Sequence, residues 1–299
     1  MTLAALLRFS ITGLLLCAML WLVGWWQLGW PLVAVIGATG IVFIHAPSMV
    51  LEFALAHWQN RRDPAPAASA AEILRAWWAE VVGAIVVFGW QVPWRSARYP
   101  DHLPSDAAGR RGLVLVHGFV CNRGIWNPWW PRLMTLGSPV VALNLEPVFA
   151  SIDDYAPQID AAVRQVTELT GQPPLLVAHS MGGLAVRAWM RRFDANNRVH
   201  RVVTVGTPHG GTRLARFGYG PNAHEMRMLS PWFNTLVTSE TLARQAKFTC
   251  YYSRCDNIVF PCSSATLANA DNRHLPGHGH VHLLDHPAIL DEVVRLLRE

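Results

Sequence analysis

The sequence has little charge, few cysteines and no run of basic residues. Only 15% of its 299 residues are charged, and its 25 basic residues are scattered along the chain. This distribution does not indicate nucleic-acid binding, so we expect no nucleic-acid partner. The five cysteines form no CxxC pair and no zinc-binding spacing, and their odd number does not suggest a disulfide framework. One bridge, between Cys250 and Cys255, is left open for an oxidising compartment.

Apolar residues are what the chain has in excess. Hydrophobic residues make up 52% of it, and its mean hydropathy of +0.20 is high for a soluble protein. The excess is concentrated near the start, where nine of the 14 tryptophans lie within residues 1–94. The composition therefore predicts membrane segments in the first third of the chain, followed by a globular part.

Two long uncharged runs stand close together near the N-terminus. Residues 9–28 contain no charge over 20 positions, and residues 31–51 are nearly as apolar, with a Gly-Trp-Pro turn signal between them. About 20 apolar residues suffice for a helix to cross a bilayer. We therefore expect residues 1–60 to form a transmembrane hairpin with helices at about 9–28 and 31–53. The alternative, a cleaved signal peptide followed by a core helix, lacks a small-residue cleavage site.

Basic residues flank the expected hairpin and predict its orientation. Arg8 precedes the first helix, Arg61 and Arg62 follow the second, and the turn carries none. The positive-inside rule then places both ends in the cytoplasm, so we expect a multi-pass protein of a bacterial inner membrane with its globular part on the cytoplasmic side. Residues 61–110 are interpreted as a linker with an interfacial helix at 72–94. If that helix spanned the membrane instead, the globular part would face the opposite side.

From residue 111 onward, short apolar runs alternate with amphipathic helical patterns. This alternation predicts an α/β class, with a mostly parallel sheet covered by helices on both faces. We expect residues 111–299 to form one catalytic domain with a short cap insertion at 212–246. Ligand sites in such sheets lie at the carboxyl ends of the strands. The expected strands are residues 113–117, 139–144, 174–178, 201–205 and 248–253.

Ser180 is the first candidate catalytic residue. It lies in LLVAHSMGGLAVR, directly after an expected strand and directly before a helical pattern. A nucleophile on such a sharp turn needs small residues two positions to either side, and Ala178 and Gly182 meet that need, although Ala178 replaces the usual glycine. Because a serine hydroxyl is a weak nucleophile at its own pKa, it also needs a base.

An acid and a histidine should follow the serine in that order. Asp256 comes directly after the last expected strand, and the stretch GHGHVHLLDH offers several histidines. The loop can present only one of His278, His280 and His282 to the serine. Without a nearby acid or cysteine, these histidines do not form a familiar zinc site, so we expect no metal.

Backbone amides should complete the site by holding an oxyanion. We expect these donors to be the amides of Met181, directly after the serine, and Phe119, in the loop after the first strand. An apolar substrate pocket is also expected, although core packing explains the same side chains equally well. The pocket candidates are Trp126, Trp129, Trp130, Met226 and Trp232.

These residues together resemble the α/β-hydrolase superfamily, in particular its lipase and esterase branch. The resemblance implies a Ser180 nucleophile, a His280 base and an Asp256 orienting acid, with no cofactor. The Gly-His-Val-His-Leu-Leu context selects His280 over its neighbours, and the alanine-containing elbow is similar to that of compact bacterial lipases. The motifs that carry the resemblance are VHGFV at 116–120, AHSMGG at 178–183, VGTPHGGT at 205–212, SRCDNIV at 253–259 and GHVHLL at 279–284.

The sequence thus predicts a membrane-anchored serine hydrolase of carboxylic esters, with a lipidic or apolar acyl substrate. A thioesterase or an acyltransferase with the same triad is one alternative, and a non-catalytic membrane-bound scaffold of the same fold is another. The expected partners are an ester or lipid substrate and membrane lipid. The sequence indicates neither the acyl-chain length nor the oligomeric state.

Overall fold

One parallel sheet of six strands organises the C-terminal two thirds of the computed structural model, which describes residues 2–299. The strand order is β2-β1-β3-β4-β5-β6, and every neighbouring pair is parallel. The sheet confirms the predicted α/β class. The strands are β1 (Leu113–Val116), β2 (Val140–Ala142), β3 (Leu175–His179), β4 (Val202–Val205), β5 (Phe248–Tyr252) and β6 (Asp271–His274).

The edge strand β6 is the one that the sequence did not predict. Its residues Asp-Asn-Arg-His are polar and exposed or half-buried, so they carry neither an apolar run nor an alternating pattern. By contrast, β1 to β4 are buried along their whole length, as expected for strands that are covered on both faces.

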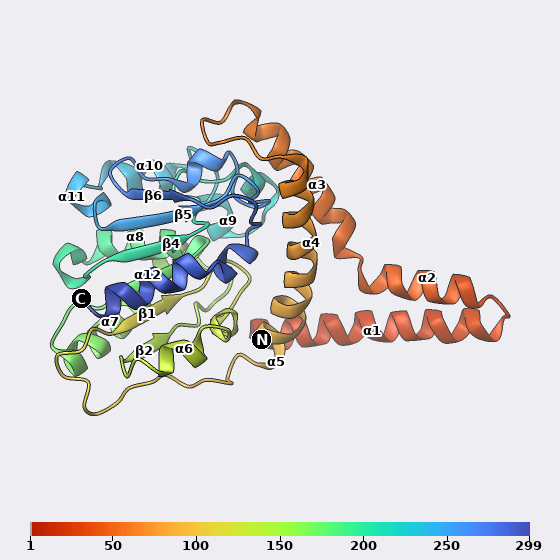
Figure 1. The fold of residues 1–299 in the computed structure, drawn as a ribbon, viewed down its shortest axis with the longest axis horizontal. Helices are drawn as coiled ribbons and strands as arrows, with labels where there is room; N and C mark the ends of the chain where they lie inside the picture. The colour runs from red at the N-terminus through yellow and green to blue at the C-terminus, as the bar shows by residue number, and fades with distance from the viewer. Residues whose placement is uncertain (1) are drawn as a thin grey trace.

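Helices cover the two faces of the sheet, and alternate residues of each strand pack against them. In β1, Val114 and Val116 belong to one core cluster, while Leu113 and Leu115 belong to the other. The first core lies under α7 and α8, and the second under α6 and α12 (Figure 1). These helices are α6 (Trp130–Met134), α7 (Ala156–Thr170), α8 (Met181–Arg192) and α12 (Pro287–Leu297).

Short helices between β4 and β5 occupy the expected cap insertion. They follow the Gly-Gly-Thr end of the motif after β4 and bring the chain back to β5 beside the sheet. Their bounds are η6 (Arg213–Phe217), α9 (Pro221–Glu225), α10 (Pro231–Thr238) and α11 (Leu242–Gln245).

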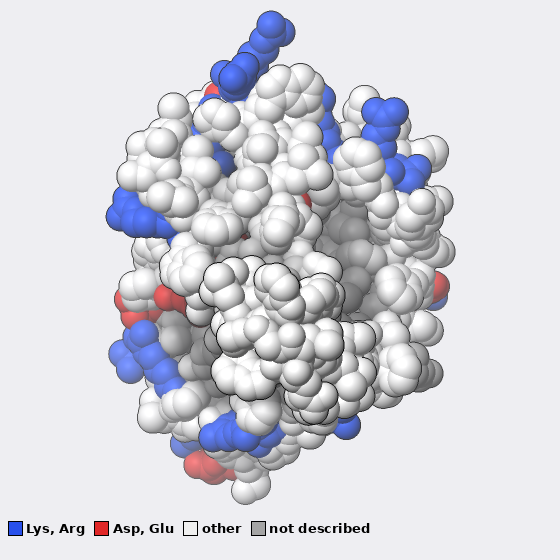
Figure 2. All heavy atoms as spheres, turned by 90° about the vertical axis from the view of Figure 1, so that its right-hand side faces the viewer, with Lys and Arg blue, Asp and Glu red and all other residues white. Residues whose placement is uncertain are grey.

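The N-terminal helices form a hairpin that projects from the α/β body and then an antiparallel pair that lies against it (Figure 1). The indole of Trp21 in α1 donates to the Val33 carbonyl in α2 at 3.2 Å, which ties the two arms of the hairpin together. Seen from the hairpin side, the centre of the surface carries almost no charge and basic side chains lie around its rim (Figure 2). The helices are α1 (Leu3–Gln27), α2 (Pro31–Val42), α3 (His45–Gln59) and α4 (Ala70–Val86), which continues through η2 (Val87–Gln91) into α5 (Val92–Trp94).

The second apolar run differs from the single helix expected at 31–53. The helix breaks after Val42, and the following helix is bent away by 52°. Pro47 lies in the first turn of α3, where its ring is tolerated, whereas in a continuous helix it would clash with the carbonyl four residues earlier. By length and composition, Leu3–Gln27 and Ala70–Trp94 could each cross a membrane, and the bent pair Pro31–Val42 with His45–Arg62 could form a third span.

Candidate active site

Ser180 lies on a sharp turn between β3 and α8. Its backbone has φ 54° and ψ −131°, a conformation that residues other than glycine rarely adopt. The turn is held on both sides: the Ser180 amide donates to the Val205 carbonyl at 2.9 Å, and the Thr207 hydroxyl donates to the Ser180 carbonyl at 2.8 Å. The serine therefore stands at the carboxyl end of the central strand.

The small residues around Ser180 have a packing reason. A Cβ atom on Gly182 would lie 2.5 Å from the carbonyl oxygen of His117, and one on Gly183 would lie 2.3 Å from the Thr207 hydroxyl. Any side chain at these positions would push α8 away from β1 and from the loop after β4. The glycines after the serine therefore let α8 begin close to the sheet.

His280 and Asp256 form a buried pair at the same edge of the sheet. The Nδ1 atom of His280 lies 2.8 Å from Asp256 Oδ2, so Nδ1 is the protonated nitrogen. The other carboxylate oxygen of Asp256 accepts the amides of Ile258 and Val259, both at 2.8 Å. The carboxylate is thus fixed by its own loop, and within residues 2–299 the Nε2 atom of His280 carries no hydrogen bond.

The environment of His280 favours its charged form. Burial by itself lowers the pKa of His280, but the charge and hydrogen bond of Asp256, together with the charges of Glu80 and Glu52, outweigh burial and raise that pKa above its usual range. Burial has the opposite outcome at two neighbouring histidines, where no carboxylate compensates. It lowers the pKa of His117 to about 4 and that of His179 well below its usual value.

His179, the residue before Ser180, contacts His280 directly. The His179 and His280 rings lie 4.7 Å apart, and His179 Nε2 donates to the His280 carbonyl at 3.2 Å. Among the described residues, no hydrogen bond joins Ser180 Oγ to the His280 ring. Catalytic hydrogen bonds are often long in a site without substrate, so this geometry is compatible with a nucleophile and its base.

Only one of the three predicted histidines pairs with the acid. His278 is directed to the Pro276 carbonyl at 2.7 Å and stacks on His282 with ring centroids 4.7 Å apart. Burial and the neighbouring His278 lower the pKa of His282. Among residues 2–299, no group of three or more His, Cys, Asp or Glu side chains could hold a metal ion.

The two predicted oxyanion donors belong to segments that lie next to Ser180. Met181 is the first residue of α8, and the loop after β1 approaches so closely that a Cβ atom on Gly118 would lie 3.2 Å from Ser180 Oγ. Phe119 follows in this loop and packs edge to face on Phe149, with ring centroids 5.8 Å apart. The loop is braced by His117, a residue for which the sequence motifs indicated no role. Its Nδ1 donates to the Gly118 carbonyl at 2.8 Å, and its Nε2 accepts the Leu145 amide at 2.8 Å.

Three of the predicted pocket tryptophans lie in the core, which is the alternative that the sequence left open for them. Trp126, Trp129 and Trp130 are at most 4% exposed and belong to the core between the sheet and α12. The indole of Trp129 donates to the Leu284 carbonyl at 3.1 Å. They fill this space because the sheet face there needs large apolar side chains. Met226 and Trp232 belong to the cap insertion, where Met226 is buried in the core under α7 and α8 and Trp232 is partly buried against that core.

The five cysteines are all free, so the bridge left open between Cys250 and Cys255 is not formed. Cys250 lies in β5 and Cys255 in the loop after it. Burial raises the pKa of the Cys250 thiol to about 12 and that of Cys255 to about 11. Neither thiol is therefore a thiolate near neutral pH.

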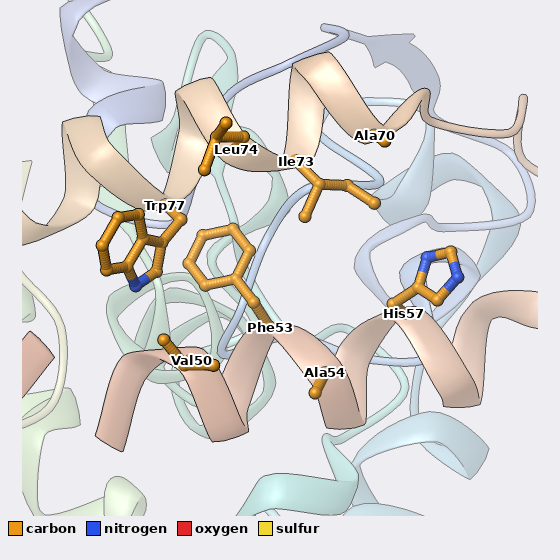
Figure 3. Close-up of a pocket in the computed structure, with 8 residues that line it drawn as sticks. All are labelled: Val50, Phe53, Ala54, His57, Ala70, Ile73, Leu74 and Trp77. Carbon is orange, nitrogen blue, oxygen red and sulfur yellow. The ribbon is translucent and has the colours of Figure 1, made fainter. Parts of the chain in front are cut away.

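Two apolar cavities border α3. One, of about 490 Å³, is a groove between α3 and α4, with His57 at one end (Figure 3). The other, of about 690 Å³, lies between α3 and the cap insertion. Its walls are largely apolar but include three arginines, Arg213, Arg216 and Arg227. Ser180 lines neither of them. The groove residues are Val50, Phe53, Ala54, His57, Ala70, Ile73, Leu74 and Trp77.

Comparison with known proteins agrees with the observed fold. A family model described as alpha/beta hydrolase fold matches residues 113–289, and no curated protein matches the chain. Among solved structures, the mature lipase BlEst2 of Bacillus licheniformis is 17% identical, with a TM-score of 0.57, and the match covers 67% of this chain and 99% of that one. Lipase B of Aspergillus fumigatus is 19% identical, with a TM-score of 0.58, over 70% of this chain and 58% of that one. At these identities the likeness is one of fold.

Proposed function

Because the chain belongs to the α/β-hydrolase fold family, we propose that it is a membrane-anchored serine hydrolase that cleaves carboxylic esters. One observation carries the proposal: Ser180 occupies a strained turn at the same sheet edge as the buried His280–Asp256 pair. Strained backbone conformations cluster at functional sites, where the surrounding structure holds them in place. The histidine whose pKa is raised is also the one bonded to the acid.

The proposed reaction is acyl transfer to water. His280 Nε2 takes the proton of Ser180 as Oγ attacks the ester carbonyl, and Asp256 orients the ring and stabilises its charged form. The amides of Phe119 and Met181 hold the oxyanion of the tetrahedral intermediate. His280 then protonates the leaving alcohol. Water activated by His280 finally cleaves the acyl-enzyme and regenerates Ser180.

Two features favour a lipidic ester as substrate. The first is the N-terminal hairpin, whose apolar surface suits a bilayer. The second is the cavity between α3 and the cap insertion, which combines apolar walls with Arg213 and Arg216. Arg227 lines it too, but its guanidinium donates to the carbonyls of Ala215, Arg216 and Gly218. This combination suits an ester that carries an apolar acyl chain and an anionic group.

The proposal predicts that a fluorophosphonate probe labels wild-type protein at Ser180 and that Ser180→Ala is not labelled. The reason is that only an activated serine attacks such a probe at a useful rate. Labelling of the full-length chain in detergent, followed by peptide mapping, is the measurement. An unlabelled wild type would favour the non-catalytic scaffold.

A panel of esters and thioesters of increasing acyl length, assayed on protein that the probe labels, then identifies the substrate class. We expect the highest kcat/KM with long-chain oxygen esters, because the substrate reaches the site from an apolar environment. A preference for thioesters, or transfer to an added alcohol in place of water, would support the thioesterase or acyltransferase alternatives.

A further inference from the structure

The segment after α3, which includes Asn60 and Asp63, is hydrogen-bonded to the loop that carries the proposed catalytic acid. This acid loop comprises residues 253–263. Asn60 Oδ1 accepts the Cys262 amide, and Asp63 Oδ2 accepts the Ser263 amide, both at 2.8 Å. The Arg254 guanidinium donates to backbone carbonyls of the same segment, among them that of Asp63 at 3.2 Å. These bonds join parts of the chain about 200 residues apart.

Glu80 of α4 supports the turn that carries the catalytic histidine, residues 278–282. Its side chain is 2% exposed, and its Oε1 accepts the His282 amide at 2.8 Å. A Cβ atom on Gly279 would lie 2.2 Å from Glu80 Cγ, so glycine is needed there to leave room for the carboxylate. A buried carboxylate is costly unless it is bonded, and its partner here is the backbone of the histidine turn.

Glu52 of α3 reaches the same turn through one intermediate side chain. The Asn257 amide nitrogen donates to Glu52 Oε2 at 2.7 Å, and the Asn257 amide oxygen accepts the His280 amide at 3.3 Å. Asn257 is only 1% exposed, whereas Glu52 is half-buried. The backbone of His280 is thus tied to α3 on one side, while the turn rests on α4 on the other.

We infer that Glu52 and Glu80 are positioning residues of the hydrolase site, supplied by the helices that link the membrane hairpin to the catalytic domain. They hold the histidine turn in place and, when ionised, place negative charge near the imidazole. The inference rests on the proposed function, because it requires His280 to be the base. Neither carboxylate is assigned a contact with substrate or with the reacting atoms.

The titratable groups that face His280 come from four elements. Asp256 comes from the acid loop, His179 from β3, Glu80 from α4 and Glu52 from α3. His179 stays neutral because burial lowers its pKa. When ionised, the three carboxylates favour the protonated ring, so removal of one lowers the pKa of His280. Burial raises the pKa of Glu80 to about 7, so Glu80 contributes its charge near neutral pH and above. The acidic limb of kcat/KM reports this pKa and should move to lower pH.

The test compares Glu80→Gln, Glu52→Gln and the double variant with wild type, as full-length chains in detergent micelles on a water-soluble short-chain nitrophenyl ester. Glutamine keeps the shape and an acceptor oxygen but loses the charge. We expect kcat to fall about tenfold, a small part of what a positioned base contributes, with KM unchanged. The acidic limb should move to lower pH, and furthest in the double variant. Glu168→Gln, an exposed change on α7, is the matched control and should match wild type.

A second substitution of Glu80 distinguishes its effect on the position of the histidine turn from the effect of its charge. Glu80→Ala also removes the bond to the His282 amide, and we expect kcat to fall about 10²-fold, as for a misplaced catalytic group. If this variant does not fold, the glutamine variants still decide. Wild-type kcat and an unmoved pH profile in Glu80→Gln and Glu52→Gln, with wild type labelled at Ser180, would overturn this inference alone. An unlabelled wild type would overturn the proposed function and the inference with it.

Discussion

The backbone at Ser180 shows how single residues prepare the site. A non-glycine residue at φ 54° costs on the order of 1–3 kcal/mol, which neighbouring contacts must offset. Here the bonds to Val205 and Thr207 do so, and they come from the strand next to the serine and from the loop after it. The same loop brings Gly206 so close to His280 that a Cβ atom there would lie 3.1 Å from Nδ1. Serine and histidine are therefore placed by one shared element.

At the scale of single residues, the histidine turn allows a direct prediction. His280→Ala should lower kcat by about 10⁴-fold or more, since residues of a triad act as a unit. His278→Ala and His282→Ala should retain most of the activity, because neither ring bonds Asp256. Steady-state kinetics on the three purified variants is the measurement. Loss of activity in His278→Ala or His282→Ala, with His280→Ala active, would reassign the base.

The roles predicted around Ser180 follow from sequence motifs alone. Turn chemistry is local, so the small residues beside the serine already indicated an elbow. The tryptophans were different, because an aromatic side chain near a predicted site can equally pack into the core. Only the three-dimensional arrangement shows that Trp126, Trp129 and Trp130 lie on the α12 side of the sheet.

At the scale of elements, helix α8 packs very close to the sheet at Gly182. A Cβ atom on Gly182 would lie 2.5 Å from the backbone oxygen of His117, which cannot move without moving the end of β1. Gly182→Ala should therefore lower the free energy of unfolding by about 1–3 kcal/mol, despite alanine's better helix propensity. It should also lower kcat, because α8 begins with Met181, whose amide we propose as an oxyanion donor.

Gly83→Ala in α4 is the matched control for that substitution. No atom lies within 4 Å of the added Cβ, so only helix propensity acts, and stability should stay equal or rise by up to about 1 kcal/mol. Thermal unfolding of both variants in the same detergent measures the difference. Equal melting temperatures for Gly182→Ala and wild type would contradict the packing argument.

Element boundaries show where local pattern succeeds and fails. The five apolar strands lie close to their expected positions, because buried strands in a parallel sheet are recognisable as apolar runs. The polar edge strand β6 pairs with β5 alone, and nothing in its own sequence indicates that pairing. The sequence pattern likewise did not predict the break between α2 and α3, because hydropathy is insensitive to a proline within an apolar run.

For the molecule as a whole, the N-terminal helices divide into two groups. The hairpin of α1 and α2 points away from the α/β body, while α3 and α4 lie against it (Figure 1). The contact of Glu80 with the histidine turn ties α4 to the catalytic domain. Along α4 and η2, the side chains of Leu74, Trp78 and Trp90 are exposed, which suits the surface of a bilayer. We therefore expect α4 to lie along the membrane without crossing it.

This arrangement predicts on which side of the membrane the catalytic domain lies. Protease added to intact spheroplasts should leave the domain uncut, whereas protease added to inverted vesicles should degrade it. The physical reason is that Arg8, near the start of α1, and Arg61 and Arg62, after α3, favour the cytoplasmic side by the positive-inside rule. Immunoblotting for the C-terminus is the measurement. Cleavage in intact spheroplasts would mean that Ala70–Trp94 crosses the bilayer.

Local patterns in the chain were sufficient for the α/β class, the chain order of serine, acid and histidine, and the apolar N-terminal runs. Each of these depends on periodicity, turn chemistry or length, which act over a few residues to some twenty. The partnership of Glu52 with Asn257 spans 205 positions, and that of Glu80 with His282 spans 202. Contacts of this kind, like the burial of the tryptophans, arise only when distant segments pack together. The reason is that the burial of a side chain and the charges around it depend on the residues that are near it in space.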